Sequence, residues 1–313
     1  RLGGEHLPRP QPPRVHPLRT RPVREPLDVG GRAINGLLTL GRGQRVGLMA
    51  GSGVGKSVLL GLITRQTQAD VVVVGLIGER SREVREFIER SLGVQGLARS
   101  VLVVAPADES PLMRLNATEL CHSIAAHYRD QGLHVLLLVD SLTRYAMAKR
   151  EVALALGEPP ATRGYPPSVF SLLPQLVESA GNGEKPAGSM SAIYTVLAEG
   201  DDQQDPVVDT ARAILDGHIV LSRALAERGH YPAIDVMASV SRCMSLVADP
   251  RHQQAARHAK EMVARHDRVS AMLPLGAYVA GADPATDRAV ALYPHIEAFL
   301  HQGTHEAAPL ADS

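Results

Sequence analysis

AGSGVGKS, residues 50–57, lies between an apolar run, GQRVGLMA at residues 43–50, and a segment with helical periodicity, KSVLLGLITRQT at residues 56–67. A glycine-rich loop between a buried strand and a helix presents backbone N–H groups to an anion, and the dipole of the following helix attracts negative charge. This context, with a lysine and a serine at the end of the loop, predicts a phosphate-binding loop rather than a glycine-rich turn without a ligand.

Each residue type in the loop has a chemical task. Small residues let the backbone approach the phosphates, Lys56 places a cation against the β- and γ-phosphates, and the Ser57 hydroxyl supplies an oxygen for Mg²⁺. The strict form of the pattern has glycine at the position of Ala50, but alanine is small enough to be accommodated. The predicted ATP-binding residues of this segment are Gly51, Ser52, Gly53, Val54, Gly55, Lys56, Ser57 and Val58.

A second apolar run, HVLLLVD at residues 134–140, ends in Asp140. A carboxylate at the end of a strand next to a phosphate-binding loop can hold the water shell of Mg²⁺, so Asp140 joins Ser57 as a predicted metal residue. The alternative is that Asp140 only forms a turn or caps a helix. The presence of the phosphate-binding loop favours the role at Mg²⁺.

The run VVVVGLIGER, residues 71–80, ends in a carboxylate beside a guanidinium. In a parallel sheet the functional groups collect at the carboxyl ends of the strands, and this strand follows the helix of the phosphate-binding loop. Glu79 is therefore a candidate general base that deprotonates a water aimed at the γ-phosphate, and Arg80 a candidate phosphate contact. The alternative is that the two residues pair with each other or cap the following helix.

The order of apolar and helical segments predicts an α/β fold. Short strand-like runs at Val71–Ile77, Val101–Val104, His134–Val139 and Ser191–Leu197 alternate with helical periods, which is typical of a mostly parallel sheet covered on both faces. After residue 250 two helical segments follow without strands between them, at residues 251–269 and 283–302. We expect a nucleotide-binding domain at residues 27–250, a small all-α domain at 251–313, and a frayed tail at 303–313.

The first 26 residues alternate prolines with arginines and show no apolar period, as in an extended linker. Because a linker joins two parts, we expect that an N-terminal domain precedes it in the whole protein; a mobile natural tail is the alternative. Lys+Arg and Asp+Glu both number 33, so the global basic excess of a sequence-independent nucleic-acid binder is absent. Two widely separated cysteines and no long apolar run fit a reducing cytosol and peripheral contact with a membrane.

Several motifs in one order carry a resemblance to a known family. The phosphate-binding loop, GER (78–80), LLLVDSLTRYA (136–146), GYPPSVF (164–170) and PAIDVMASVSR (232–242) together resemble the catalytic subunits of rotary ATPases. REPLDVGGRAIN (24–35), AEGDDQQDP (198–206) and RAILDGHIVLSRALAERGHYPAID (212–235) resemble, more narrowly, the export ATPases of type III secretion systems and of the flagellum. The resemblance covers the chain from about residue 22 to 302.

The resemblance implies roles for individual residues. Glu79 matches the catalytic glutamate of the family, Arg80 a phosphate-contacting arginine and Asp140 the Mg²⁺-associated aspartate. Tyr231 matches the tyrosine that stacks on adenine, although a lone tyrosine is more often a core residue. Arg242 matches the arginine finger that reaches the nucleotide of the neighbouring subunit, although a lone arginine more often forms a surface ion pair. Asp201 and Asp202 match a loop that lines the central pore.

The resemblance also implies a RecA-like core, an N-terminal β-barrel, a homohexameric ring and ATP hydrolysis with Mg²⁺ that energises protein export. The implied partners are a coiled-coil central stalk, a stator or regulator, and complexes of export chaperones with effectors. The implied location is the cytoplasmic face of the inner membrane, at the export apparatus. Residues 240–269 favour the injectisome branch, with flagellar export as the alternative. Further alternatives are a catalytically silent ring subunit, a rotary ATPase subunit and a RecA-like nucleic-acid motor. Glu79 disfavours the silent subunit, and the neutral net charge disfavours the nucleic-acid motor.

Overall fold

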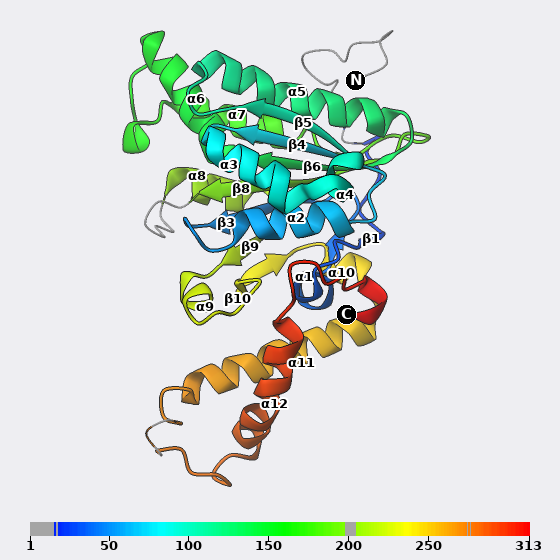
Figure 1. Ribbon diagram of the computed structural model, residues 1–313, viewed down its shortest axis with the longest axis vertical. Helices are drawn as coiled ribbons and strands as arrows, with labels where there is room; N and C mark the ends of the chain where they lie inside the picture. Colours follow the sequence, from blue (N-terminus) through cyan, green and yellow to red (C-terminus); the bar gives the residue numbers. More distant parts are fainter. Residues whose placement is uncertain (1–15, 17, 198–204, 274, 276) are drawn as a thin grey trace.

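A mostly parallel β-sheet forms the centre of the computed structural model (Figure 1), which describes residues 16, 18–197, 205–273, 275 and 277–313. The strands lie in the order β10-β9-β3-β8-β6-β4-β5, and a short strand, β7, pairs with β8. All neighbours are parallel except β10 beside β9 and β7 beside β8. The strands are β3 (Arg45–Ala50), β4 (Val71–Ile77), β5 (Ser100–Ala105), β6 (His134–Asp140), β7 (Gly181–Asn182), β8 (Ser189–Leu197), β9 (Gly217–Leu221) and β10 (Ile234–Ser241).

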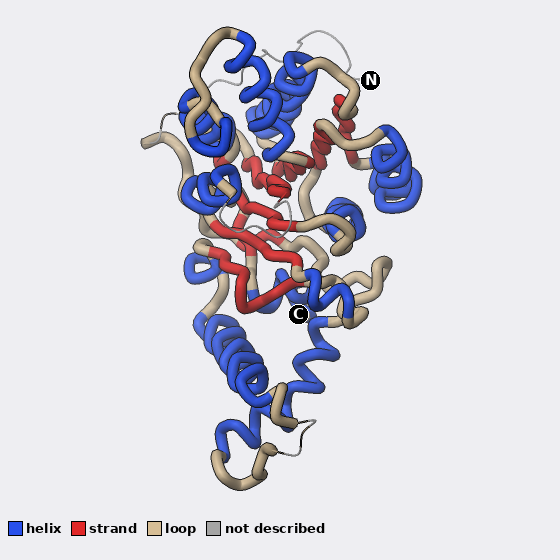
Figure 2. The backbone as a smooth tube through the Cα atoms, turned by 90° about the vertical axis from the view of Figure 1, so that its left-hand side faces the viewer, coloured by secondary structure: helices blue, strands red, loops and turns tan. Residues whose placement is uncertain are grey.

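Helices cover both faces of this sheet (Figure 2). One face packs against α5 (Pro111–Asp130), α6 (Leu142–Ala155), α7 (Pro167–Val177) and α8 (Pro206–Ile214). The other packs against α1 (Arg32–Leu37), α2 (Lys56–Gln66), α3 (Ser81–Glu86) and a π-helical turn at Phe87–Leu92, which leads into α4 (Gly93–Ala98). The predicted α/β fold with a RecA-like, mostly parallel core is therefore confirmed.

The valine run of β4 shows why the strand is apolar throughout. Side chains alternate between the two faces of a strand, so Val73 and Ile77 enter one core while Val72, Val74 and Leu76 enter the other. Both cores are closed by helices, and a polar residue at any of these positions would be buried without a partner. The continuous apolar pattern thus suits an interior strand, and β4 lies between β6 and β5.

Two long helices, α11 (Pro250–Val269) and α12 (Pro284–Leu300), form an arm that projects from the sheet beyond β10 (Figure 1). The predicted helical C-terminal region is therefore confirmed. Asp249 and Asp283 cap the two helices by accepting backbone N–H groups, and a proline follows each cap, as is typical of helix N-termini. Shorter elements are β1 (Pro26–Leu27), β2 (Leu40–Gly41), α9 (Arg223–Glu227), α10 (Met244–Val247), and 3₁₀ turns at Thr162–Gly164 and Leu310–Asp312.

The C-terminal tail does not fray, so that expectation was wrong. After α12 the chain returns to α1, where Ala308 is only 3% exposed. The Asn35 side chain donates to the Ala308 carbonyl (3.0 Å), and the Leu310 N–H donates to a carboxylate oxygen of Asp28 (2.8 Å). The sequence GTHEAAPLADS has no apolar period, but these polar contacts order it without one.

The described end of the predicted linker is attached to the core. Arg21 donates three hydrogen bonds to backbone carbonyls of Gly183, Ala187 and Gly188, and Asn182 donates to the Arg21 carbonyl. Residues 1–15 and 17 lie outside the described part of the chain. Within the described part, no helix is both long enough and apolar enough to cross a membrane.

Candidate active site

The glycine-rich loop has the backbone geometry of a phosphate cradle. Gly53 and Gly55 have φ angles of 75° and 91°, in the left-handed region that favours glycine. Gly55 is the N-cap of α2 and no side chain caps the helix, so the N–H groups of its first turn are available to an anion. The Ser57 hydroxyl is at the surface of this turn and has no hydrogen-bond partner among the described residues.

Behind the loop, Lys56 bridges two carboxylates at the carboxyl ends of neighbouring strands. Its ammonium lies 2.6 and 2.8 Å from the two carboxylate oxygens of Asp140 and 3.3 Å from an oxygen of Glu79. Asp140 ends β6 and Glu79 follows β4, which pairs with β6 in parallel. The structure therefore brings together the predicted phosphate lysine, the predicted base and the predicted metal residue, which are distant in the sequence.

Burial shifts the protonation equilibria of all three groups. Burial raises the pKa of Glu79 and the nearby Glu83 carboxylate adds to this, although Lys56 acts in the opposite direction. Burial likewise raises the pKa of Asp140 against the effect of Lys56. Burial would lower the pKa of Lys56, but the attraction of Asp140 and Glu79 outweighs it and raises the value. A carboxylate with a raised pKa accepts a proton more readily than an exposed one, which suits a general base.

Asp140 is held by a residue that the sequence analysis missed. Thr195 on β8 donates its hydroxyl hydrogen to the same carboxylate at 2.6 Å. The alternative of a capping role for Asp140 is wrong, because the side chain of Ser141 caps α6. Thr195 lies within a strand whose other residues are almost all buried, and a single threonine in such a run gives no sequence signal of its partner.

Glu79 is placed by a tight turn. Gly78 has a φ of 73°, and a Cβ at this position would lie 2.9 Å from Cγ of Arg144 on α6. The alternative, in which Glu79 and Arg80 pair with each other or cap the following helix, is wrong: no ion pair joins them, and no side chain caps α3. Arg80 pairs instead with Glu83 at 3.8 Å, and its side chain is 84% exposed at the edge of the site. The structure therefore assembles Glu79 with Lys56 but leaves Arg80 outside their cluster.

Tyr231 lies beside the phosphate-binding loop. Its ring would be 3.5 Å from a Cβ on Gly55, and the residue is 44% exposed. The alternative of an ordinary core tyrosine does not fit a ring that is this exposed. An open aromatic face next to the loop offers a flat surface for a nucleobase.

Arg242 lies far from this cluster within one chain. It follows β10, which is antiparallel to β9, and its N–H donates to the carbonyl of Asp216 just before β9 begins. The residue is therefore at the amino ends of the parallel strands, opposite the phosphate-binding loop. Its exposed guanidinium donates to the Arg212 carbonyl at 3.1 Å. Asp201 and Asp202 lie outside the described residues.

The donor groups fit Mg²⁺. Ser57 and Asp140 offer a hydroxyl and a carboxylate, and hard oxygen ligands are what Mg²⁺ prefers beside phosphates. Histidine and cysteine ligands, which would indicate a softer metal, are not among the residues assembled here.

Comparisons with known proteins agree with this geometry. The family model described as "ATP synthase alpha/beta family, nucleotide-binding domain" matches residues 30–241, and the model "T3SS EscN ATPase C-terminal domain" matches residues 248–313. The chain is 61% identical to the flagellum-specific ATP synthase of Pseudomonas aeruginosa, over 96% of this chain and 67% of that protein. It is 50% identical to the type 3 secretion system ATPase of Xanthomonas euvesicatoria, over 93% of this chain and 65% of that protein.

A solved structure has a similar fold. The assembled ATPase EscN of enteropathogenic E. coli, in complex with its central stalk EscO, superimposes with a TM-score of 0.90 at 45% identity, over 99% of this chain and 75% of that one. This chain spans about two thirds of the length of the two curated relatives named above. The chain belongs to the ATP synthase alpha/beta family, and within it to the export ATPases of flagella and type III secretion systems.

Proposed function

We propose that this chain binds ATP with Mg²⁺ and hydrolyses it between the subunits of a homohexameric ring that energises protein export through a type III secretion apparatus. The observation that carries the proposal is the buried bridge of Lys56 to Glu79 and Asp140 behind a glycine-rich loop. The family membership supports the same reaction, because its members named above are ATPases or ATP synthases.

Each residue of the site has its own role in the proposed reaction. The loop N–H groups and Lys56 hold the β- and γ-phosphates, and Ser57 and Asp140 hold Mg²⁺, which neutralises charge on the phosphates when bound. Glu79 takes a proton from the attacking water, and Thr195 keeps the Asp140 carboxylate in place. Arg80 approaches the phosphates from the edge of the site and Tyr231 stacks on adenine. Arg242 serves the nucleotide of the adjacent subunit.

The proposed partners follow from the relatives and from the family. The assembled EscN and its complex with a central stalk support a ring around a coiled-coil stalk. A stator or regulator, chaperone–effector complexes and a peripheral position at the cytoplasmic side of the inner membrane complete the proposal. No nucleic-acid partner is proposed, since acidic and basic residues balance.

The test of the reaction is Glu79→Gln, which keeps the shape of the side chain but removes proton acceptance. We expect ATP hydrolysis to fall by about 10²–10⁴-fold while a fluorescent-nucleotide titration still shows binding. The matched control is Glu86→Gln, which removes an exposed carboxylate from α3 that pairs only with Arg90 among the described residues. Normal hydrolysis per folded molecule in Glu79→Gln would refute the assignment of the base.

Flagellar export is a second candidate for the apparatus, and one observation favours it. The identity to the flagellum-specific relative is 61%, against 50% for the type 3 secretion relative. The expression of this protein in strains that lack either the flagellar or the injectisome ATPase would separate the two. Restored swimming without restored effector secretion assigns the flagellum, and the reverse result assigns the injectisome.

A further inference from the structure

Three side chains with metal-binding atoms meet outside the nucleotide site. The ring nitrogens of His230 and His301 and a carboxylate oxygen of Glu297 lie within 4.8 Å of one another. The two imidazole rings lie with their centroids 4.0 Å apart and their planes tilted by 50°. Ligand atoms bound about 2.0–2.1 Å from a tetrahedral Zn²⁺ are about 3.3 Å apart. The three ligand atoms, which lie within 4.8 Å of one another, can therefore reach one ion after small side-chain rotations.

The three residues come from two different parts of the molecule. His230 lies in the loop between α9 and β10, where its N–H donates to the Leu225 carbonyl at 3.0 Å. Glu297 is on the last turn of α12, and His301 follows that helix with its N–H on the Glu297 carbonyl at 3.0 Å. An ion held by all three would therefore join the sheet domain to the C-terminal arm.

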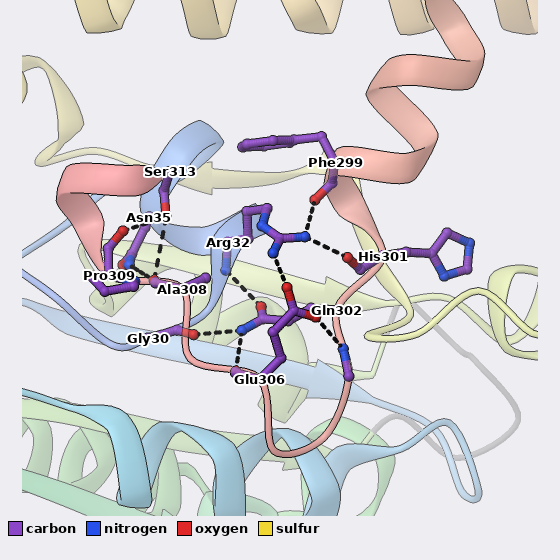
Figure 3. Close-up of polar contacts among 11 residues, drawn as sticks. Gly30, Arg32, Asn35, Phe299, His301, Gln302, Glu306, Ala308, Pro309 and Ser313 are labelled. Atoms are coloured by element: carbon purple, nitrogen blue, oxygen red, sulfur yellow. Dashed lines mark hydrogen bonds and ion pairs between the residues drawn. The ribbon is translucent and has the colours of Figure 1, made fainter.

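A polar network fixes the backbone at His301 (Figure 3). Arg32 donates to the His301 carbonyl at 2.8 Å, and its own N–H donates to the side-chain oxygen of Gln302 at 2.8 Å. The Gln302 amide donates to the carbonyls of Gly30 (2.7 Å) and Glu306 (2.8 Å). The His301 ring points away from this network in Figure 3, so the network positions the residue without using its imidazole.

The backbone on the other side is fixed as well. The Gln302 N–H donates to the Tyr231 carbonyl at 3.0 Å, directly beside His230. The two histidines are thus held close together by main-chain and Arg32 contacts that do not involve their rings. Prearranged ligands lower the entropy that a metal site must lose on binding.

No hydrogen bond or ion pair within the described part of the chain holds these three side chains, apart from their contacts with one another, although the charge of Arg228 acts on His230. Two imidazoles and a carboxylate form a ligand set that suits Zn²⁺ and similar transition metals, whereas Mg²⁺ prefers an all-oxygen set. A tetrahedral ion held by these three ligands would take its fourth ligand from water.

We propose that His230, Glu297 and His301 form a binding site for a divalent transition metal, with Zn²⁺ as the best fit, that links the C-terminal arm to the sheet domain. The site is separate from the proposed Mg²⁺ position at Ser57 and Asp140 and does not depend on the proposed function. When filled, it ties α12 to the loop that carries Tyr231.

The test is calorimetric titration of the chelator-treated protein with ZnCl₂ in the presence of excess Mg²⁺. We expect a single equivalent to bind and the melting temperature to rise, because an ion that binds only the folded state stabilises it. His301→Gln and Glu297→Gln should each weaken binding at least tenfold, since even changes to residues outside the ligand set cost about 10–100-fold. His295→Gln, which removes an exposed histidine from the same helix, is the matched control and should bind normally.

Co²⁺ provides a second measurement. A four-coordinate site gives intense visible absorption, which should appear in the wild type and in His295→Gln and disappear in His301→Gln. The proposal is overturned if the wild type binds no stoichiometric Zn²⁺, or if binding and absorption survive in both ligand variants. The proposal is also overturned if His295→Gln loses as much Zn²⁺ affinity as the two ligand variants. Circular dichroism checks that every variant is folded.

Discussion

Arg242 offers the sharpest test of the proposed ring, because it lies too far from the phosphate-binding loop of its own chain to reach a nucleotide bound there. Ser241 pairs with Gly217, and the next residue of β9, His218, pairs with Gly47 of β3. Arg242 is therefore level with the start of β3, about five residues before Ala50. At about 3.3 Å per residue, this places it about 17 Å along the sheet from the beginning of the phosphate-binding loop.

The perturbation is Arg242→Ala. An arginine that stabilises charge on the transferred phosphoryl group contributes about 10³–10⁵-fold in rate, so the variant should be nearly inactive. Stability should change little, because the guanidinium is exposed and its one side-chain hydrogen bond among the described residues goes to the Arg212 carbonyl. The variant alone, however, does not show in which subunit the arginine acts.

The assay therefore mixes two inactive variants, Glu79→Gln and Arg242→Ala, in rings whose exchange of subunits is confirmed by native mass spectrometry. A head-to-tail ring has heterologous interfaces, so an interface is intact when an unaltered Glu79 faces an unaltered Arg242. With random mixing at equal amounts, roughly a quarter of the interfaces are intact in this sense. Phosphate released in a single turnover is measured, because steady cycling can stall in a mixed ring.

The expected burst rises from near zero for each parent to a maximum at equal amounts of the two variants, and it falls symmetrically on either side. A role of Arg242 within its own subunit predicts no burst at any ratio. If subunits exchange and no mixture exceeds the parents, the assignment of Arg242 to the neighbouring nucleotide is wrong.

Two further predictions concern stability. Gly78→Ala places a Cβ 2.9 Å from Arg144 at a φ of 73° and should lower the free energy of unfolding, measured in urea, by about 1–3 kcal/mol. The control is Gly157→Ala, which has a φ of 85° and open space around the Cβ and therefore measures the backbone cost alone. An equal loss of stability in both variants would show that the contact with Arg144 adds nothing. Burial lowers the pKa of His122 and of His134 to about 4, below the ordinary 6.5. Between these two pH values the unfolded state binds more protons than the folded state. The free energy of unfolding should therefore fall as the pH drops from about 6.5 to about 4, by up to about 3 kcal/mol per histidine. His122→Gln should flatten this dependence in unfolding curves at several pH values, and an unchanged dependence would contradict the reasoning.

Local patterns were sufficient for the phosphate-binding loop and for most of the sheet. The loop needs glycines at positions of positive φ, and the strands need apolar residues on both faces, so both features are visible in consecutive residues. The strands β4, β5, β6 and β8 lie where the apolar runs predicted them. The expectation about the tail failed because its order comes from single polar contacts to α1 and the loop before it, which leave no period in the sequence.

The roles of Glu79, Asp140, Tyr231 and Arg242 required more than local patterns. Their chemistry was predicted from strand ends and from the resemblance to a family, but a carboxylate at a strand end is equally compatible with a cap or an ion pair. The distances from Lys56 to Glu79 and Asp140 exist only because β4 and β6 are neighbours in the sheet.

The sequence by itself determined the loop chemistry, the α/β class and the family, because each follows from short runs of consecutive residues and from the order of those runs along the chain. Only the tertiary structure decided that Thr195 supports Asp140, that Arg80 lies outside the cluster and that His230 meets Glu297 and His301. The contacts of Thr195 and His230 join residues far apart in the sequence, and the position of Arg80 outside the cluster is likewise set by the fold around it. All three depend on the strand order of the sheet or on the packing of the arm against it.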